Sequence, residues 1–215
     1  MIANKLSNIE FVNRISLIQN ICKDRTVLHL GATDAPETKN AIENARFLHQ
    51  HINSVAKKVV GIDIDIDMID WLSHNHGYNN ILYGNIEKLQ DYPQEKFDVI
   101  IAGEIFEHLS NPGKALESIR SFVNSSTKLV ITVPNAYSIK GFLRSLIKYE
   151  LIHPDHTLHH SPHTLKALLE RHRFSIINYF SYVNSGKGIF ASVTNSFIRS
   201  NPQVAEGIGV ICEPK

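Results

Sequence analysis

The chain has 215 residues, with 22 Lys and Arg against 21 Asp and Glu, and 43% of its residues are hydrophobic. This length fits one domain, so we expect residues 1–215 to form a single domain. The near-zero net charge argues against the wrapping of duplex nucleic acid, and the hydrophobic content excludes a disordered chain. The only cysteines, Cys22 and Cys212, exclude a disulfide framework and a cysteine-rich zinc module.

Residues 1–14 lack the pattern of a signal peptide. No apolar run in the sequence approaches the roughly 18–20 residues that a membrane span needs. We therefore expect a cytoplasmic protein without a membrane span.

Helical and β-type patterns alternate along the chain. We expect helices at residues 7–22 (within an N-terminal segment 1–24), 37–52, 68–74, 112–123, 138–147 and 162–171. We expect strands at residues 26–30, 58–62, 80–83, 97–102, 129–133, 174–182 and 207–212. Asn111 and Ser161, each followed by proline, are predicted N-caps.

The strands at 58–62, 97–102 and 129–133 are nearly continuous apolar runs, which is typical of strands covered by helices on both faces. With the alternation of strands and helices, this predicts a doubly wound α/β sheet. The segment 137–161, which includes the helix predicted at 138–147, is the predicted cover over the substrate side of the sheet.

Ligands of such folds bind outside the carboxyl ends of the strands. The residues that follow the first four strands include Gly31, Asp63, Asn85 and the pair Gly103-Glu104. Each could have a purely structural role as a turn or cap residue. Together they place an acid, an amide and glycines of close approach along one sheet edge, which a nucleoside-containing cofactor requires.

These motifs resemble, in order and spacing, those of class I S-adenosylmethionine (SAM)-dependent methyltransferases. VLHLGATDA resembles the glycine-rich first motif, VVGIDID the second and YGNIEKL the third. FDVIIAGEIFEHLSNP resembles the fourth motif and LVITVPN the fifth strand, while the stretch HPDHTLHHSPHTLKALLERHRFSI resembles a segment of small-molecule and sugar methyltransferases. The resemblance implies a Rossmann-like seven-stranded sheet flanked by helices, with the last strand antiparallel.

By the same resemblance, Asp63 holds the ribose hydroxyls of SAM, Ile64 packs on a face of adenine, and Asn85 lies at the adenine edge beside the backbone of Ile86. The first loop, with Gly31, Thr33 and Asp34, holds the methionine end, and Gly103 lines the site.

The first loop departs from the family pattern, because His29 stands where an acid is usual, and Thr33 and Ala35 where glycines are usual. A β-carbon at those positions limits how closely the backbone approaches the ligand. We expect SAM binding to survive, with the methionine end held differently.

The absence of a fourth motif of the Asn/Asp-Pro-Pro-Tyr/Phe type argues against methylation of bases or glutamine and favours a hydroxyl of a small molecule or sugar. A hydroxyl must lose its proton to a base or to a metal-bound state. The candidate catalytic residues are His156, His153, Glu104 and His108.

A divalent metal is a further hypothesis, with Glu104, Glu107, His108 and His156 as ligands. One helical turn would put Glu104, Glu107 and His108 on one face. Two carboxylates and two imidazoles suit Mg²⁺, Mn²⁺, Fe²⁺ or Zn²⁺. The spacing is similar to that of metal-dependent O-methyltransferases that act on vicinal hydroxyls. Without a metal, His156 or His153 is the predicted general base.

Two other functions fit parts of the sequence. A nicotinamide-dependent reductase would share the fold, but Gly-x-Gly-x-x-Gly is absent. A degenerate, non-catalytic SAM-binding or partner-binding module would explain Thr33 and Ala35. The sequence leaves the methyl acceptor and the oligomeric state open, and a dimer is one possibility.

Overall fold

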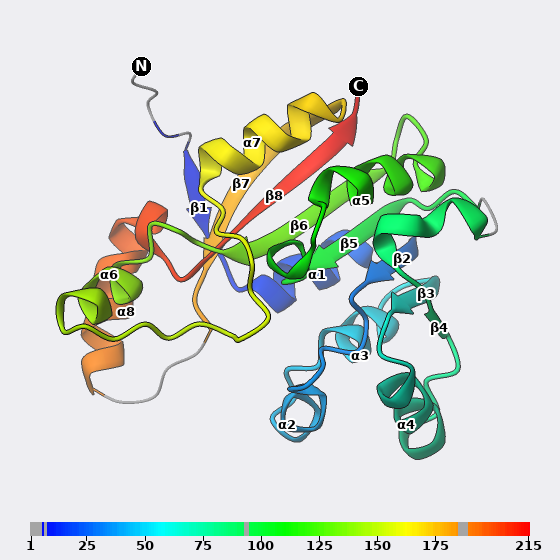
Figure 1. The fold of residues 1–215 in the computed structure, drawn as a ribbon, viewed down its shortest axis with the longest axis horizontal. Coiled ribbons are helices and arrows are strands. Elements are labelled where there is room, and N and C mark those ends of the chain that lie inside the picture. Colours follow the sequence, from blue (N-terminus) through cyan, green and yellow to red (C-terminus); the bar gives the residue numbers. More distant parts are fainter. Residues whose placement is uncertain (1–5, 7, 93–94, 185–188) are drawn as a thin grey trace.

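The structure of the protein is a computed structural model that describes residues 6, 8–92, 95–184 and 189–215. Its centre is one sheet of eight strands in the order β1-β7-β8-β6-β5-β2-β3-β4 (Figure 1). The strands are β1 (Ile9–Phe11), β2 (Thr26–Leu30), β3 (Lys58–Asp63), β4 (Ile81–Tyr83), β5 (Val99–Gly103), β6 (Lys128–Pro134), β7 (Phe174–Tyr182) and β8 (Gly207–Pro214). As predicted, the last strand is antiparallel, pairing with both β6 and β7, whereas the other pairs are parallel.

Helices cover both faces of the sheet. They are α1 (Arg14–Cys22), α2 (Thr38–Glu43), α3 (Leu48–Asn53), α4 (Ile66–His76), α5 (Pro112–Ile119), α6 (Ile139–Leu146), α7 (Pro162–Arg171) and α8 (Ile189–Ser200), with short 3₁₀ helices η1 (Ile86–Asp91), η2 (Phe106–His108), η3 (Arg120–Phe122) and η4 (Pro202–Val204). In Figure 1, α5 and α7 lie on one side of the sheet and α1 and α3 on the other.

Alternation along the strands produces two separate cores. Leu28 and Ile100 pack with the buried residues of α5 and α7, while Val27 and Ile101 pack with those of α1 and α3. Each central strand is therefore apolar on both faces, as the near-continuous runs in the sequence predict. This arrangement confirms the doubly wound α/β class.

The predicted N-terminal helix at 7–22 is too long. Residues Ile9–Phe11 form an additional edge strand parallel to β7, which makes the sheet eight-stranded instead of seven-stranded. The helix begins only at Arg14, because the side chain of Asn13 caps it by accepting from the backbone N–H of Ser16 at 2.9 Å. The predicted caps Asn111 and Ser161 are both present, the latter in a capping box with Thr164.

The single helix predicted at 37–52 is two helices, α2 and α3. Ala45 has φ +51°, and the N–H groups of Ala45 and Arg46 bond the carbonyls of Ile42 and Ala41. This is a helix-ending Schellman arrangement. The sequence analysis also missed α8. No helix in the described part of the chain is long and apolar enough to cross a membrane.

Candidate active site

The carboxyl ends of β2, β3, β4 and β5 meet at one edge of the sheet. Leu30 is in register with Ile62 and with Ala102, and Asp63 with Tyr83. The loops that follow these strands carry the cofactor residues predicted from the sequence, so the structure brings those residues to one edge as expected.

Asp63 ties the first loop to the second. Its Oδ2 accepts from the backbone N–H of Thr33 at 2.9 Å, and its Oδ1 accepts from that of Asp65 at 3.0 Å. The carboxylate is 9% exposed. Each carboxylate oxygen can accept a further hydrogen bond, so this fixed group can still receive two hydroxyls.

Two features of the first loop fit a bound ligand. Gly31 has φ +70°, and a Cβ there would lie 3.1 Å from the side chain of Ile105, so the close turn needs glycine. The hydroxyl of Thr33 is buried without a hydrogen-bond partner among the described residues. Asp34, also at positive φ, and Ile64, 60% exposed, lie open at the same edge.

Asn85 has the structural role that the sequence left open. Its Oδ1 caps η1 by accepting from the backbone N–H of Glu87 at 2.8 Å. The side chain of Ile86 is buried in the core, while its N–H belongs to the first turn of η1, which has no carbonyl partner within the helix. Capping fixes the orientation of the amide without using its NH₂ group.

Arg14 is a site residue that sequence reasoning missed. It begins α1, yet it lines a small cavity together with His29, Gly31, Asp34, Arg46 and Gly103. Its Nε is buried without a hydrogen-bond partner in the described part of the chain, and no described carboxylate lies within salt-bridge distance of it. A Cβ on Gly103 would come to 2.8 Å from Arg14 Nη2, so glycine makes room for the guanidinium.

His29, which stands where an acid is usual, belongs to the core. It is 2% exposed, and its Nδ1 lies 3.1 Å from Nδ1 of His49. Nε2 of His49 lies 3.3 Å from Oδ1 of Asn80, whose NH₂ donates to Asn53 and Val59. This network assigns the proton of His49 to Nε2 and lets His29 donate to His49. Burial lowers the pKa of His49 to about 4 and that of His29 well below its usual range.

Glu104 lies at the end of β5 with φ +53°, a conformation that is strained for a residue with a side chain. The hydroxyl of Tyr182, at the end of β7, donates to Glu104 Oε1. The guanidinium of Arg14 stacks 5.4 Å from the centre of the Tyr182 ring. Burial, and then the charge of Glu104, raises the pKa of Tyr182 well above its usual range, so it remains a donor at neutral pH.

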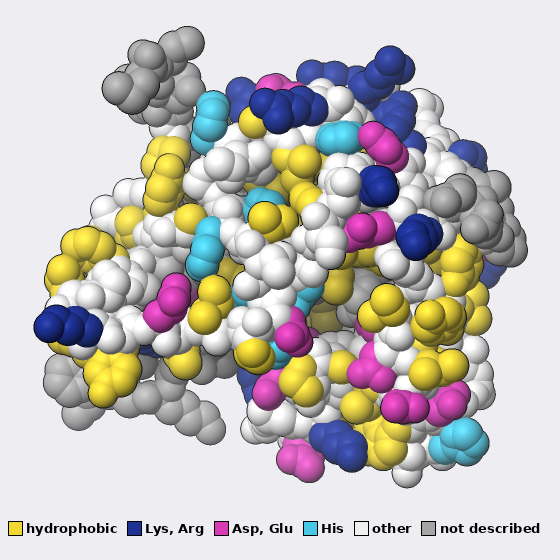
Figure 2. Space-filling view, viewed as in Figure 1, with side chains coloured by type: hydrophobic (Ala, Val, Ile, Leu, Met, Phe, Trp, Pro, Cys, Tyr) yellow, Lys and Arg dark blue, Asp and Glu magenta, His cyan; other side chains and the backbone are white. Residues whose placement is uncertain are grey.

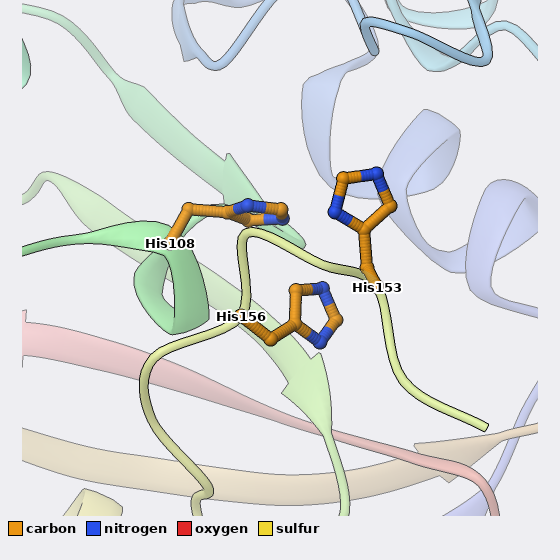
Figure 3. Close-up of side chains that lie close together, drawn as sticks. All are labelled: His108, His153 and His156. Carbon is orange, nitrogen blue, oxygen red and sulfur yellow. The ribbon is translucent and has the colours of Figure 1, made fainter. Parts of the chain in front are cut away.

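Three histidines converge beyond the end of β5. His108 comes from η2, and His153 and His156 come from the turn that folds over it (Figure 3). One ring nitrogen of each lies within 4.8 Å of those of the other two, and the ring centres are 4.5–5.4 Å apart. This cluster does not come from the residues that directly follow the strands. It depends on a contact between two segments about 45 residues apart in the sequence.

Backbone hydrogen bonds hold the two segments together. The carbonyl of Glu107 accepts from the N–H of Thr157 at 2.9 Å and from that of Leu158 at 3.3 Å. The N–H of His156 bonds the carbonyl of His153 at 3.1 Å, which closes the turn. Burial, followed by the neighbouring histidines, lowers the pKa of both His108 and His156.

The side chain of Glu107 lies behind the cluster, 1% exposed, with Oε1 at 3.9 Å from Nε2 of His156. Neither of its oxygens has a hydrogen-bond partner among the residues that the structure describes. Burial and then the charge of Glu104 raise the pKa of Glu107.

The predicted metal ligands are therefore only partly brought together. His108, His156 and Glu107 are neighbours, but the helical turn expected to align Glu104 with them does not form. The positive φ of Glu104 and the short 3₁₀ helix turn its side chain towards Tyr182 instead. His153, which the sequence analysis considered only as a base, takes the third place in the group.

Solved structures share this fold. A SAM-dependent methyltransferase from Archaeoglobus fulgidus superposes with a TM-score of 0.57 at 20% identity, covering 93% of this chain and 94% of that one. One from Aquifex aeolicus has a TM-score of 0.60 at 17% identity, covering 94% and 88%. No curated protein sequence matches the chain.

The family comparison covers most of the sequence. The family described as "Methyltransferase domain" matches residues 9–179, which include the first loop, Asp63, Asn85 and the histidine cluster. The chain thus belongs to the methyltransferase domain family and is a SAM-dependent methyltransferase of class I.

Proposed function

We propose that this methyltransferase acts on a hydroxyl group of a small molecule or sugar, which is bound at the cluster of His108, His153 and His156. The observation that carries the proposal is the convergence of three imidazoles at the end of β5, within 4.8 Å of one another. Methyl transfer from a sulfonium is an in-line displacement, so the protein mainly positions its two reactants. An oxygen acceptor also has to lose a proton, and the cluster supplies groups for that step.

The cofactor lies, in this proposal, along the edge from the first loop to Asn85. Asp63 accepts from the ribose hydroxyls with the lone pairs that Thr33 and Asp65 leave free. Ile64 packs on adenine, and the NH₂ of Asn85 and the N–H of Ile86 bond its edge. Gly31, Thr33, Asp34 and Gly103 surround the methionine end.

In this proposal Arg14 helps to hold the methionine end of SAM, which the altered first loop cannot approach as closely as a glycine-rich loop would. A guanidinium with its Nε buried, and with no carboxylate within salt-bridge distance among the described residues, is energetically unfavourable unless an anion completes the site. The carboxylate of the methionine end is such an anion. The cavity that Arg14 lines beside Gly31 and Gly103 is therefore its proposed binding place.

The histidine cluster fits a divalent metal better than the four ligands predicted from the sequence. Three nitrogen donors favour Zn²⁺ or Fe²⁺ over Mg²⁺, which prefers oxygen ligands. The buried carboxyl of Glu107, with neither oxygen hydrogen-bonded in the described chain, supplies a negative charge for a cation. When bound, the metal would lower the pKa of a coordinated hydroxyl.

The test compares His153→Ala with His159→Ala, which removes an exposed histidine from the same segment. We expect His153→Ala to weaken Zn²⁺ binding at least about tenfold in calorimetry, a loss of about 1.4 kcal/mol, with SAM affinity unchanged. His159→Ala should behave as the unsubstituted protein.

Turnover of SAM to S-adenosylhomocysteine is then followed with a panel of sugars and catechols. Activity should disappear in excess chelator and return with added metal. Full activity in excess chelator would show that no metal is required, and His156 or His153 would then be the proposed base. Turnover with amines but with none of the hydroxyl compounds would overturn O-methylation.

A further inference from the structure

The helix α6 is amphipathic, and its apolar side is exposed instead of buried. Over its two turns, Phe142, Leu143 and Leu146 share one side, which Ile147 extends. Lys140 and Arg144 lie away from the centre of that side. In a globular protein the apolar side of such a helix normally packs against the core.

Here the apolar side faces outwards. Phe142 is 58% exposed, Leu143 50%, Leu146 64% and Ile147 66%, and α6 has no buried residue. Lys140 attaches the helix to the rest of the fold, because it forms a salt bridge of 2.9 Å with Glu206 and is largely covered. The fold of the described chain thus leaves this apolar side without a partner.

The exposed surface continues beyond the helix towards the active site. Tyr149 is 71% exposed, Leu151 75% and Ile152 39%, and the next residue is His153 of the histidine cluster. Figure 2 shows hydrophobic side chains, with basic and acidic ones among them, at the end of the molecule where α6 and α8 lie. We refer to Phe142, Leu143, Leu146, Ile147, Tyr149, Leu151 and Ile152 as the α6 patch. Contiguous apolar surface of this kind marks a docking site.

The charges around the α6 patch indicate what covers it. Arg144 and Lys148 flank the apolar residues, and neither forms a salt bridge with another described residue. Glu150 is the acid within residues 142–152 and is also exposed, so Arg144, Lys148 and Glu150 together carry a net charge of +1. A second copy of the chain would bring the same net positive charge against this one. An anionic lipid surface satisfies both the apolar side and the excess of positive charge, and the tyrosine of the patch suits the headgroup region.

We propose that the α6 patch docks the protein on the surface of an anionic phospholipid membrane. Phe142, Leu143, Leu146 and Ile147 enter the boundary of the acyl chains, and Arg144 and Lys148 contact the headgroups. The mode is that of an interfacial amphipathic helix, which lies in the plane of the membrane and does not cross it. If the proposed function also holds, the acceptor is an amphiphile whose hydroxyl reaches His153 from the interface.

The test is co-sedimentation of the full chain with vesicles of phosphatidylcholine alone and of phosphatidylcholine with 30% phosphatidylglycerol, at about 0.15 M salt. We expect sedimentation mainly with the anionic vesicles. The double variant Leu146→Glu/Ile147→Glu should bind them at least tenfold more weakly, and Arg144→Glu/Lys148→Glu should lose the preference for anionic vesicles. Leu146, Ile147 and Lys148 are exposed and Arg144 is partly exposed, so the thermal unfolding midpoint should not change.

The matched control is Leu82→Glu, which places the same charge on an exposed leucine at the opposite edge strand, β4. It should sediment as the unsubstituted protein does. A chain that stays in the supernatant with both vesicle types overturns the proposal, and so does a dimer in solution that Leu146→Glu/Ile147→Glu dissociates. Vesicle binding is measured without turnover, so this result does not depend on the identity of the acceptor or on the metal.

Discussion

Asp63 and Glu107 are two buried acids at the same edge of the sheet, and they differ in their hydrogen bonding. The carboxylate of Asp63 accepts two backbone N–H groups, whereas that of Glu107 has no hydrogen-bond partner among the described residues. The carboxylate of the proposed cofactor half is therefore held in place by its own loops. In the proposed acceptor half, from Glu104 to His156, the Glu107 carboxyl lacks such partners, and because an unpaired buried group is costly we expect a ligand to supply one.

This difference predicts that the two halves can be disabled separately. Changes in the cofactor half should reduce SAM affinity and leave the histidine cluster intact. Changes around the acceptor half should leave SAM affinity unchanged.

The largest effect is expected for Asp63→Ala, which removes the acceptor for both ribose hydroxyls. Charge-assisted hydrogen bonds contribute roughly 1.5–3 kcal/mol each, so SAM affinity should fall about a hundredfold in calorimetry. Asp67→Ala, which removes an exposed acid of α4, is the control and should bind SAM normally. An Asp63→Ala protein with unchanged affinity would show that the ribose is held elsewhere.

Arg14→Met tests how the methionine end is held. Methionine keeps most of the apolar volume but removes the charge, and we expect about a tenfold loss of affinity for S-adenosylhomocysteine, or about 1.4 kcal/mol. Methylthioadenosine, which lacks the amino-acid end, should bind both proteins equally. An equal loss for both ligands would mean that Arg14 supports the fold of the loop and does not contact the carboxylate.

In the acceptor half, Tyr182→Phe removes the hydroxyl that donates to Glu104. We expect the free energy of unfolding to fall by about 1.5 kcal/mol, the lower end of the usual contribution of a hydrogen bond to a charged group. SAM affinity should not change. Arg14 stacks on the Tyr182 ring. A loss of SAM affinity as large as that of Arg14→Met would therefore show that the two halves are coupled through this ring.

The same division explains what the sequence could predict. Gly31, Asp63 and Asn85 stand at or just after the ends of strands in the sequence, and the carboxyl ends of parallel strands meet at one edge of the sheet. The position of Arg14 and the grouping of His153 with His108 depend on how a helix start and a loop pack over that edge, which no periodicity encodes. Asn13, as the N-cap of α1, was the one local signal that could have located Arg14 at a helix start. The cytoplasmic location, expected because the sequence shows no signal-peptide pattern and no membrane-spanning run, stays a prediction.

The smallest effect concerns the buried pair of His29 and His49 beneath the first loop. Both pKa values are lowered in the folded protein, that of His49 to about 4 against 6.5 for a free histidine. The unfolded chain therefore binds more protons below pH 6.5, and folding stability declines as the pH falls towards 4. For His49 alone, the loss between pH 6.5 and 5.5 is about 1 kcal/mol.

The measurement is urea unfolding at these two pH values, with His49→Gln as the comparison. Glutamine can still hydrogen-bond Asn80 but does not titrate, so the difference between the two pH values should shrink by about 1 kcal/mol. His51→Gln, at a partly exposed position of α3 where no such burial occurs, should keep the full dependence. If His49→Gln keeps it as well, the acid sensitivity arises from other groups, and the pair beneath the cofactor half contributes only packing.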